Sequence, residues 1–142
     1  MNIRFAEESD LEALMVFCRR CFPFRVPEDE ARDSFMNQLR YGTVILAIDE
    51  GVRGVLAGET RWSQPFQQKM ATERVFLVDP EYRNRGAGKA LVGMFEAWAR
   101  AHGAKEVVLG TSQYGGPDPL AEAKKLETMG YSLLGYFVRK EL

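Results

Sequence analysis

Apolar positions along the chain follow two spacings. Short β-rich runs bounded by Gly, Pro and Asp predict strands at residues 2–6, 43–48, 52–60, 72–78, 106–111 and 131–140. Apolar residues three and four apart predict helices at about residues 9–22, 27–41, 86–102 and 118–129. A serine–glutamate capping box, Ser9 with Glu12, is predicted to open the first helix. The predicted order is therefore β-α-α-β-β-β-α-β-α-β.

This order predicts an α/β fold. Consecutive strands in the first half and a β-α-β unit behind them favour a mixed central sheet with helices on its faces. No repeat, low-complexity segment or linker interrupts the 142 residues, so we expect a single domain over 1–142.

Composition narrows the class of protein. The formal net charge is −1, which disfavours a nucleic-acid partner, and no apolar run approaches the ~20 residues that span a bilayer. The first ten residues lack signal-peptide character, and two cysteines do not make a disulfide framework. We therefore expect a cytoplasmic protein that does not bind a membrane.

Local charge is concentrated between the run VFLV (75–78) and the helix that follows. The turn RNRGAGK (83–89) joins them and carries three basic residues and two glycines. The N–H groups of a first helical turn attract anions, glycines allow close approach, and arginines add charge-assisted hydrogen bonds. This stretch is therefore predicted to bind an anionic group.

Two nucleotide motifs are excluded here. A P-loop needs glycine at Arg83 and serine or threonine at Ala90, and a dinucleotide fingerprint needs glycine or alanine at Leu91. What remains is Arg-x-x-Gly-x-Gly at 83–88, preceded by Val-Asp-Pro-Glu-Tyr at 78–82.

This segment, together with the element order, resembles the GCN5-related N-acetyltransferase (GNAT) family, whose signature is Gln/Arg-x-x-Gly-x-Gly/Ala after Val-x-Pro-x-Tyr-Arg. The resemblance spans nearly the whole chain. It implies a GNAT-like mixed sheet and an acetyl-CoA-dependent N-acetyltransferase. The acetyl group would pass directly to an amine acceptor in a ternary complex, without a metal. Homodimers are common among such proteins.

The resemblance also implies roles for individual residues. Backbone N–H groups of the turn would hold the CoA pyrophosphate, with charge from three basic side chains; the residues involved are Arg83, Asn84, Arg85, Gly86, Ala87, Gly88, Lys89 and Ala90. The pantetheine arm would pair with the strand backbone at Phe76, Leu77 and Val78, and an N–H group near Leu77 or Val78 would stabilise the oxyanion.

The proton-transfer groups are left open by the sequence. Glu73 and Glu59 are candidate bases for the amine, although Glu73 shares a face with Phe76 only if the strand contains a bulge. Leu126 occupies the position of the tyrosine that acts as general acid in the family. Tyr114 or Tyr131 could replace it, unless the thiolate needs no acid; Tyr114 is preferred, because Tyr131 is expected to pack as the aromatic residue after Gly130. The alternative is a non-catalytic module that binds acyl-CoA or a partner. An acceptor pocket is expected from segments 21–30, 62–66 and 113–117.

Overall fold

The computed structural model describes residues 1–22, 25–63, 68–111, 118–136 and 138–142. Its chain divides into two compact units, Met1–Gly110 and Thr111–Leu142. The larger unit contains all five strands and three of the four α-helices of the described residues, and the smaller unit contains the fourth. A single domain over 1–142 stays a prediction.

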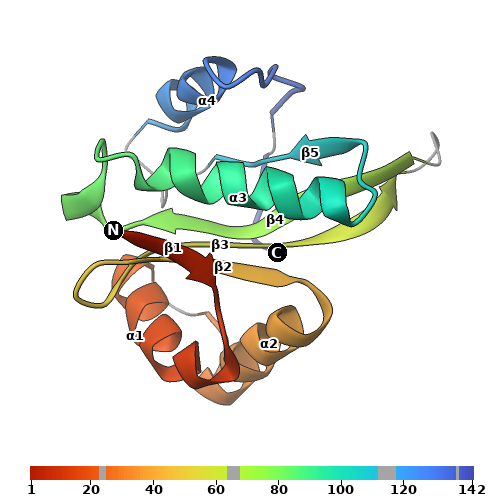
Figure 1. Cartoon of the computed structure of the whole chain (residues 1–142). Helices are drawn as coiled ribbons and strands as arrows, with labels where there is room; N and C mark the ends of the chain where they lie inside the picture. Colours follow the sequence, from red (N-terminus) through yellow and green to blue (C-terminus); the bar gives the residue numbers. More distant parts are fainter. Residues whose placement is uncertain (23–24, 64–67, 112–117, 137) are drawn as a thin grey trace. The chain divides into compact units, whose positions relative to one another are not determined.

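A five-stranded mixed sheet forms the centre of the larger unit (Figure 1). Its strands lie in chain order: β1 (Asn2–Phe5), β2 (Thr43–Ile48), β3 (Val52–Ser63), β4 (Gln68–Val78) and β5 (Glu106–Val108). Neighbours are antiparallel from β1 to β4, whereas β4 and β5 are parallel. The predicted mixed sheet is thereby confirmed.

Helices cover both faces of this sheet, as Figure 1 shows. The helices α1 (Leu11–Cys21) and α2 (Glu28–Tyr41) pack on one face, and α3 (Ala87–Ala101) packs on the other. Short 3-10 turns, η1 (Glu8–Asp10) and η2 (Pro80–Tyr82), precede α1 and α3. Because both faces are covered, the apolar runs of β2 and β3 are buried almost continuously.

Close packing of α3 on the sheet depends on a glycine of β3. A Cβ placed on Gly58 would lie 2.6 Å from the Phe95 ring of α3 and 2.7 Å from the Thr72 carbonyl oxygen. No side chain fits in this space, so Gly58 allows the Phe95 ring to rest directly on the β3 backbone. Phe95 is fully buried as a result.

The first helical segment begins earlier than predicted. The Ser9–Glu12 capping box is wrong: the Glu7 N–H donates to Asp10 Oδ2 at 2.8 Å, and the Asp10 N–H donates to Glu7 O at 2.9 Å. The Asp10 carboxylate also accepts hydrogen bonds from Nη1 and Nη2 of Arg4 on β1. This tertiary ion pair places the capping carboxylate at Asp10, and the chain enters α1 through η1.

In the smaller unit, α4 (Pro119–Glu127) begins as predicted, because the Asp118 carboxylate accepts the N–H groups of Leu120 and Ala121. The final strand is not formed: none of the described residues of 131–140 is in a strand. A strand needs a partner for its backbone groups, which an apolar pattern alone does not supply. The side chains of Leu134 and Val138 are correspondingly exposed.

Among the described residues, no helix is long and apolar enough to cross a membrane.

Gly58→Ala should lower the free energy of unfolding by about 1–3 kcal/mol, because the new methyl group overpacks the contact between β3 and α3. Gly93→Ala is the matched control: Gly93 lies within α3 with nothing within 4 Å of a Cβ, so alanine should stabilise by about 0.5–1 kcal/mol. Urea denaturation measures both variants. Equal effects of the two substitutions would contradict the packing argument.

Candidate active site

A β-bulge interrupts the pairing of β4 with β3. Ala57 pairs with Val75, but the next residue of β3, Gly58, pairs with Glu73. Arg74 is therefore the extra residue on β4. A bulge shifts the alternation of side chains by one position. The face to which Glu73 points, relative to the residues from Val75 onwards, is therefore the opposite of that in a regular strand.

The bulge places Glu73 on the α3 face of the sheet. Gly58 faces Phe95 of α3, and directly paired residues share a face, so the Glu73 side chain points to the same side. Phe76 also points there, because a Cβ on Gly88 of α3 would lie 3.8 Å from its ring. The bulge required for Glu73 and Phe76 to share a face is therefore present.

The second candidate base lies on the opposite face. Glu59 follows Gly58 on β3 and so points away from α3. Its carboxylate forms a 2.6 Å ion pair with Arg74, the bulge residue. Glu59 and Glu73 are thus separated by the sheet, and only Glu73 shares a face with Phe76.

Glu73 is partly buried and held by the backbone. Its Oε1 atom accepts the Gly110 N–H at 2.7 Å. Burial raises the pKa of the Glu73 carboxyl, and this rise is partly offset by the Gly110 hydrogen bond and by the charge of Arg74. A Cβ on Gly110 would lie 2.7 Å from Oε1, so a larger residue there would displace the Glu73 carboxylate.

β4 and β5 diverge at Glu73. β5 pairs with Met70–Thr72 of β4 and no further, although β4 continues to Val78. From Glu73 to Val78, no strand of the described chain pairs with β4 on the edge opposite β3. This edge can accept an extended ligand as an additional strand.

The register identifies which backbone groups face that open edge. The Asp79 N–H donates to Arg53 O on β3 at 2.8 Å. Backbone groups of an antiparallel strand point to alternate sides, so Leu77 directs its N–H and C=O towards β3. Phe76 and Val78 direct theirs towards the open edge. Of the two N–H groups expected near the oxyanion, that of Val78 faces this edge.

The turn after β4 ends at the N-terminus of α3. Gly86, the N-cap residue, has φ +89, a left-handed conformation that favours glycine. Its carbonyl oxygen accepts the Ala90 N–H at 3.0 Å, so Ala90 already uses its N–H within the helix. The N–H groups of residues 87–89 precede this first intrahelical bond. Glycine at the N-cap offers them no side-chain acceptor, and the first turn of α3 has no acidic residue.

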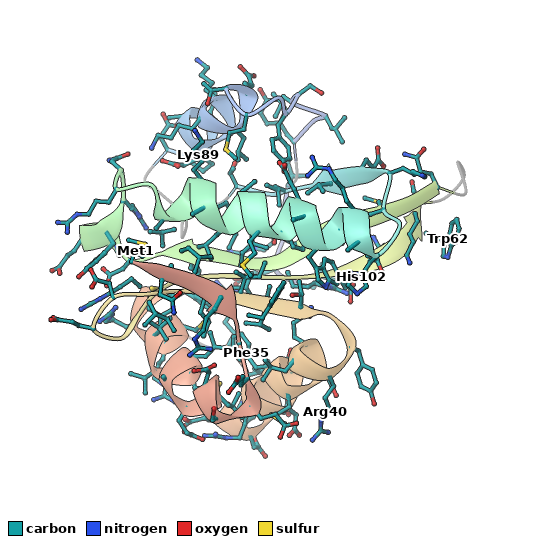
Figure 2. The ribbon with its side chains drawn as sticks, viewed as in Figure 1. Met1, Phe35, Arg40, Trp62, Lys89 and His102 are labelled. Carbon is teal, nitrogen blue, oxygen red and sulfur yellow. The ribbon has the colours of Figure 1, made fainter. Side chains whose placement is uncertain are left out.

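Basic side chains surround this N-terminus. Arg83 Nε donates to Val78 O at 3.3 Å, and the Arg85 guanidinium lies 4.9 Å from the centre of the Tyr82 ring. Figure 2 shows Lys89 at the beginning of α3 and His102 at its opposite end. The arrangement provides uncapped N–H groups, a helix dipole and basic side chains, which together suit a phosphate group.

A family model agrees with this geometry, since the acetyltransferase (GNAT) family model matches residues 11–116. The chain belongs to the GNAT acetyltransferase family. The solved structures show the same fold. An acetyltransferase of Trypanosoma brucei is 20% identical, with a TM-score of 0.77 and 99% of both chains covered. No curated protein matches the chain.

Two further structures share this GNAT fold. The aminoglycoside N-acetyltransferase AAC(6')-Iy, in complex with a CoA-containing bisubstrate analogue, is 20% identical with a TM-score of 0.81; the match covers 99% of this chain and 98% of that one. Glucosamine-6-phosphate N-acetyltransferase from Arabidopsis thaliana is 17% identical with a TM-score of 0.78, covering 99% and 97%.

Sequence reasoning missed an ion cluster beside the GNAT signature. Asp79 is 4% exposed, and its carboxylate binds Arg20 of α1 at 2.7 Å and Arg53 of β3 at 3.3 Å. It also accepts the Glu81 N–H at 3.1 Å, which holds the turn η2. Asp79 lies at a variable position of the signature, and no local pattern marks the other two residues.

Parts of the predicted acceptor side fall outside the description. Tyr114, the candidate acid, lies among residues 112–117, which the structure does not describe. Residues 23–24 of segment 21–30 and residues 64–66 of segment 62–66 are also outside the described residues. Leu126 lies in α4 of the smaller unit. The acceptor pocket and the acid therefore stay predictions.

Glu73→Gln should change how stability depends on pH. Because the folded-state pKa of Glu73 is raised, the wild-type carboxyl keeps its proton in the folded state at pH values where the unfolded chain has lost it. Wild-type stability should therefore fall as pH rises from the ordinary glutamate range through the raised pKa. Glutamine keeps an oxygen for the Gly110 N–H but does not ionise. As pH rises across that window, the free energy of unfolding of the variant should therefore increase relative to that of wild type. Urea denaturation at a series of pH values measures both. Parallel pH curves would contradict the prediction.

Proposed function

We propose that this protein is an N-acetyltransferase that transfers an acetyl group from acetyl-CoA to an amine. The observation that carries the proposal is the divergence of β4 and β5 at Glu73. Within the described part of the chain, no strand pairs with the outward backbone groups of Phe76 and Val78, and a partly buried carboxylate lies on the same strand. A thioester held at that edge would lie close to a group able to accept a proton.

The donor site combines this edge with the N-terminus of α3. Phe76 and Val78 pair with the amide groups of the pantetheine arm, as a β-strand would. The N–H groups of residues 87–89 bind the pyrophosphate, and Arg83, Arg85 and Lys89 supply positive charge. Gly86 and Gly88 keep side chains away from the backbone that the phosphates approach.

The reaction needs a neutral amine, and Glu73 produces it by accepting a proton from the ammonium group of the acceptor. Its raised pKa brings the carboxylate closer to the working range of a general base near neutral pH. The amine nitrogen attacks the thioester carbonyl carbon, and the Val78 N–H stabilises the resulting oxyanion. The C–S bond then breaks and the C–N bond remains; Glu73 holds the proton that left the ammonium group, and the second proton that the nitrogen loses passes to water. CoA leaves as the thiolate.

Leu126 favours a second candidate, a non-catalytic module that binds acyl-CoA or a partner. Leucine cannot donate a proton to the sulfur, and Tyr114 is the proposed substitute. Tight CoA binding without turnover on any amine would support this module. The acceptor, a homodimer and a cytoplasmic location also stay proposals.

Gly88→Glu should weaken CoA binding by roughly tenfold or more, because it places a negative charge at the pyrophosphate site. Gly88 suits this test better than Gly86: a Cβ at Gly88 meets only ordinary contacts, whereas Gly86 has a positive φ that would strain any side chain. Gly88→Ala is the matched control without charge and should have a much smaller effect. Isothermal calorimetry with CoA measures all three proteins. Equal affinities would place the phosphates elsewhere.

Glu73→Gln should lower kcat on the order of a hundredfold or more, with little change in the KM for acetyl-CoA, because it removes the base and not the donor site. Glu59→Gln is the control on the other face and should retain activity. Thiol release with a panel of amines provides the assay. In wild type, kcat should rise with pH through the raised pKa of Glu73. A fully active Glu73→Gln enzyme would exclude Glu73 as the base.

A further inference from the structure

Arg53 lies outside the GNAT signature but contacts the turn that the signature forms. It is near the start of β3, and its side chain is 20% exposed. Its Nε donates to Asp49 O at 2.9 Å, its Nη1 pairs with Asp79 Oδ2 at 3.3 Å, and its guanidinium lies 4.6 Å from the centre of the Tyr82 ring. Three contacts therefore hold this side chain in one orientation.

Tyr82 connects Arg53 with the phosphate turn. Its N–H donates to Asp79 O at 2.8 Å, which fixes the backbone of η2, and Arg53 restrains the ring. The Arg85 guanidinium lies over the same ring, at 4.9 Å. The ring is thus shared by one arginine of β3 and one arginine of the turn.

The two arginines differ in what their N–H donors do. Arg53 directs donors to Asp49 O and Asp79, so it is committed to the protein. Arg85 has no carboxylate partner among the residues that the structure describes, and its interaction there is with the Tyr82 ring. A cation–π contact uses the charge of a guanidinium without giving its N–H groups an oxygen acceptor, so N–H groups of Arg85 remain to bind a phosphate.

We propose that Arg53 is a positioning residue of the donor site: it holds the Tyr82 ring, and the ring orders Arg85 towards the pyrophosphate. The inference rests on the proposed function. An exposed arginine loses side-chain freedom when it binds a ligand, and ordering it beforehand reduces that loss and strengthens binding. Arg53 itself makes no contact with the ligand.

The test compares CoA affinities by calorimetry for wild type, Arg53→Met, Arg53→Lys, Tyr82→Leu and the Arg53→Met/Tyr82→Leu double variant. Each single substitution should weaken CoA binding by about three- to tenfold. Lysine should not restore affinity, since it keeps the charge but lacks the planar group that stacks and bonds. The double variant should bind about as well as the weaker single variant, because both act through Arg85.

Binding of pantetheine, which has no phosphate, separates positioning from general damage. Followed by ligand-observed NMR, it should be unchanged in every variant. Arg4→Met is the matched control, since Arg4 also pairs with an aspartate, Asp10, but away from the signature turn; its CoA affinity should equal that of wild type. Tyr82→Leu leaves the ion pair between Arg53 and Asp79 intact. If Arg53→Met unfolds, this variant still tests whether the Tyr82 ring orders Arg85.

Full rescue by lysine would show that only the charge of Arg53 matters and would overturn the proposal. Additive losses in the double variant, or an equal loss of pantetheine binding, would also overturn it. A wild-type protein that does not bind CoA contradicts the proposed function itself. A wild type that binds CoA, with variants of unchanged affinity, contradicts only the role of Arg53.

Discussion

The hydrogen bond from the Gly110 N–H to Glu73 is the interaction on which the donor side depends. The last pair between β4 and β5 is Thr72 with Val108. Two residues later, the Gly110 N–H donates to the Glu73 carboxylate instead of to a backbone carbonyl of β4. The same contact therefore ends the parallel ladder, leaves the β4 edge open and holds the proposed base.

The bulge gives the two faces of the sheet different electrostatics. With Arg74 inserted, Glu73 points to the α3 face, where burial disfavours its charge. Arg74 pairs with Glu59 on the other face, so that carboxylate already has a cationic partner. One additional residue on β4 thus separates a carboxylate suited to accept a proton from one suited to a structural ion pair.

What could be predicted from the sequence is local. The glycine-bearing turn after β4 and the helix after it follow from a signature contained in eleven consecutive positions, 78–88. The predicted cap of the first helical segment was wrong, because the capping residue Asp10 is held by Arg4, a residue on another element. Segment 131–140 has the pattern of a strand, yet pairing depends on a neighbour that the pattern does not specify. Contacts between distant segments were missed for the same reason.

The leucine at position 126 is easier to interpret once the base is placed. Two proton transfers accompany acetyl transfer, and they are not equally demanding. An alkyl amine with a pKa near 10 is almost fully protonated at neutral pH, so it needs a base, whereas a thiol with a pKa of about 8.5 leaves as a thiolate with little help. With Glu73 held by the Gly110 N–H and leucine at position 126, the protein has a group for the more demanding proton transfer, which is the deprotonation of the amine. The leucine therefore argues less against catalysis than the loss of Glu73 would.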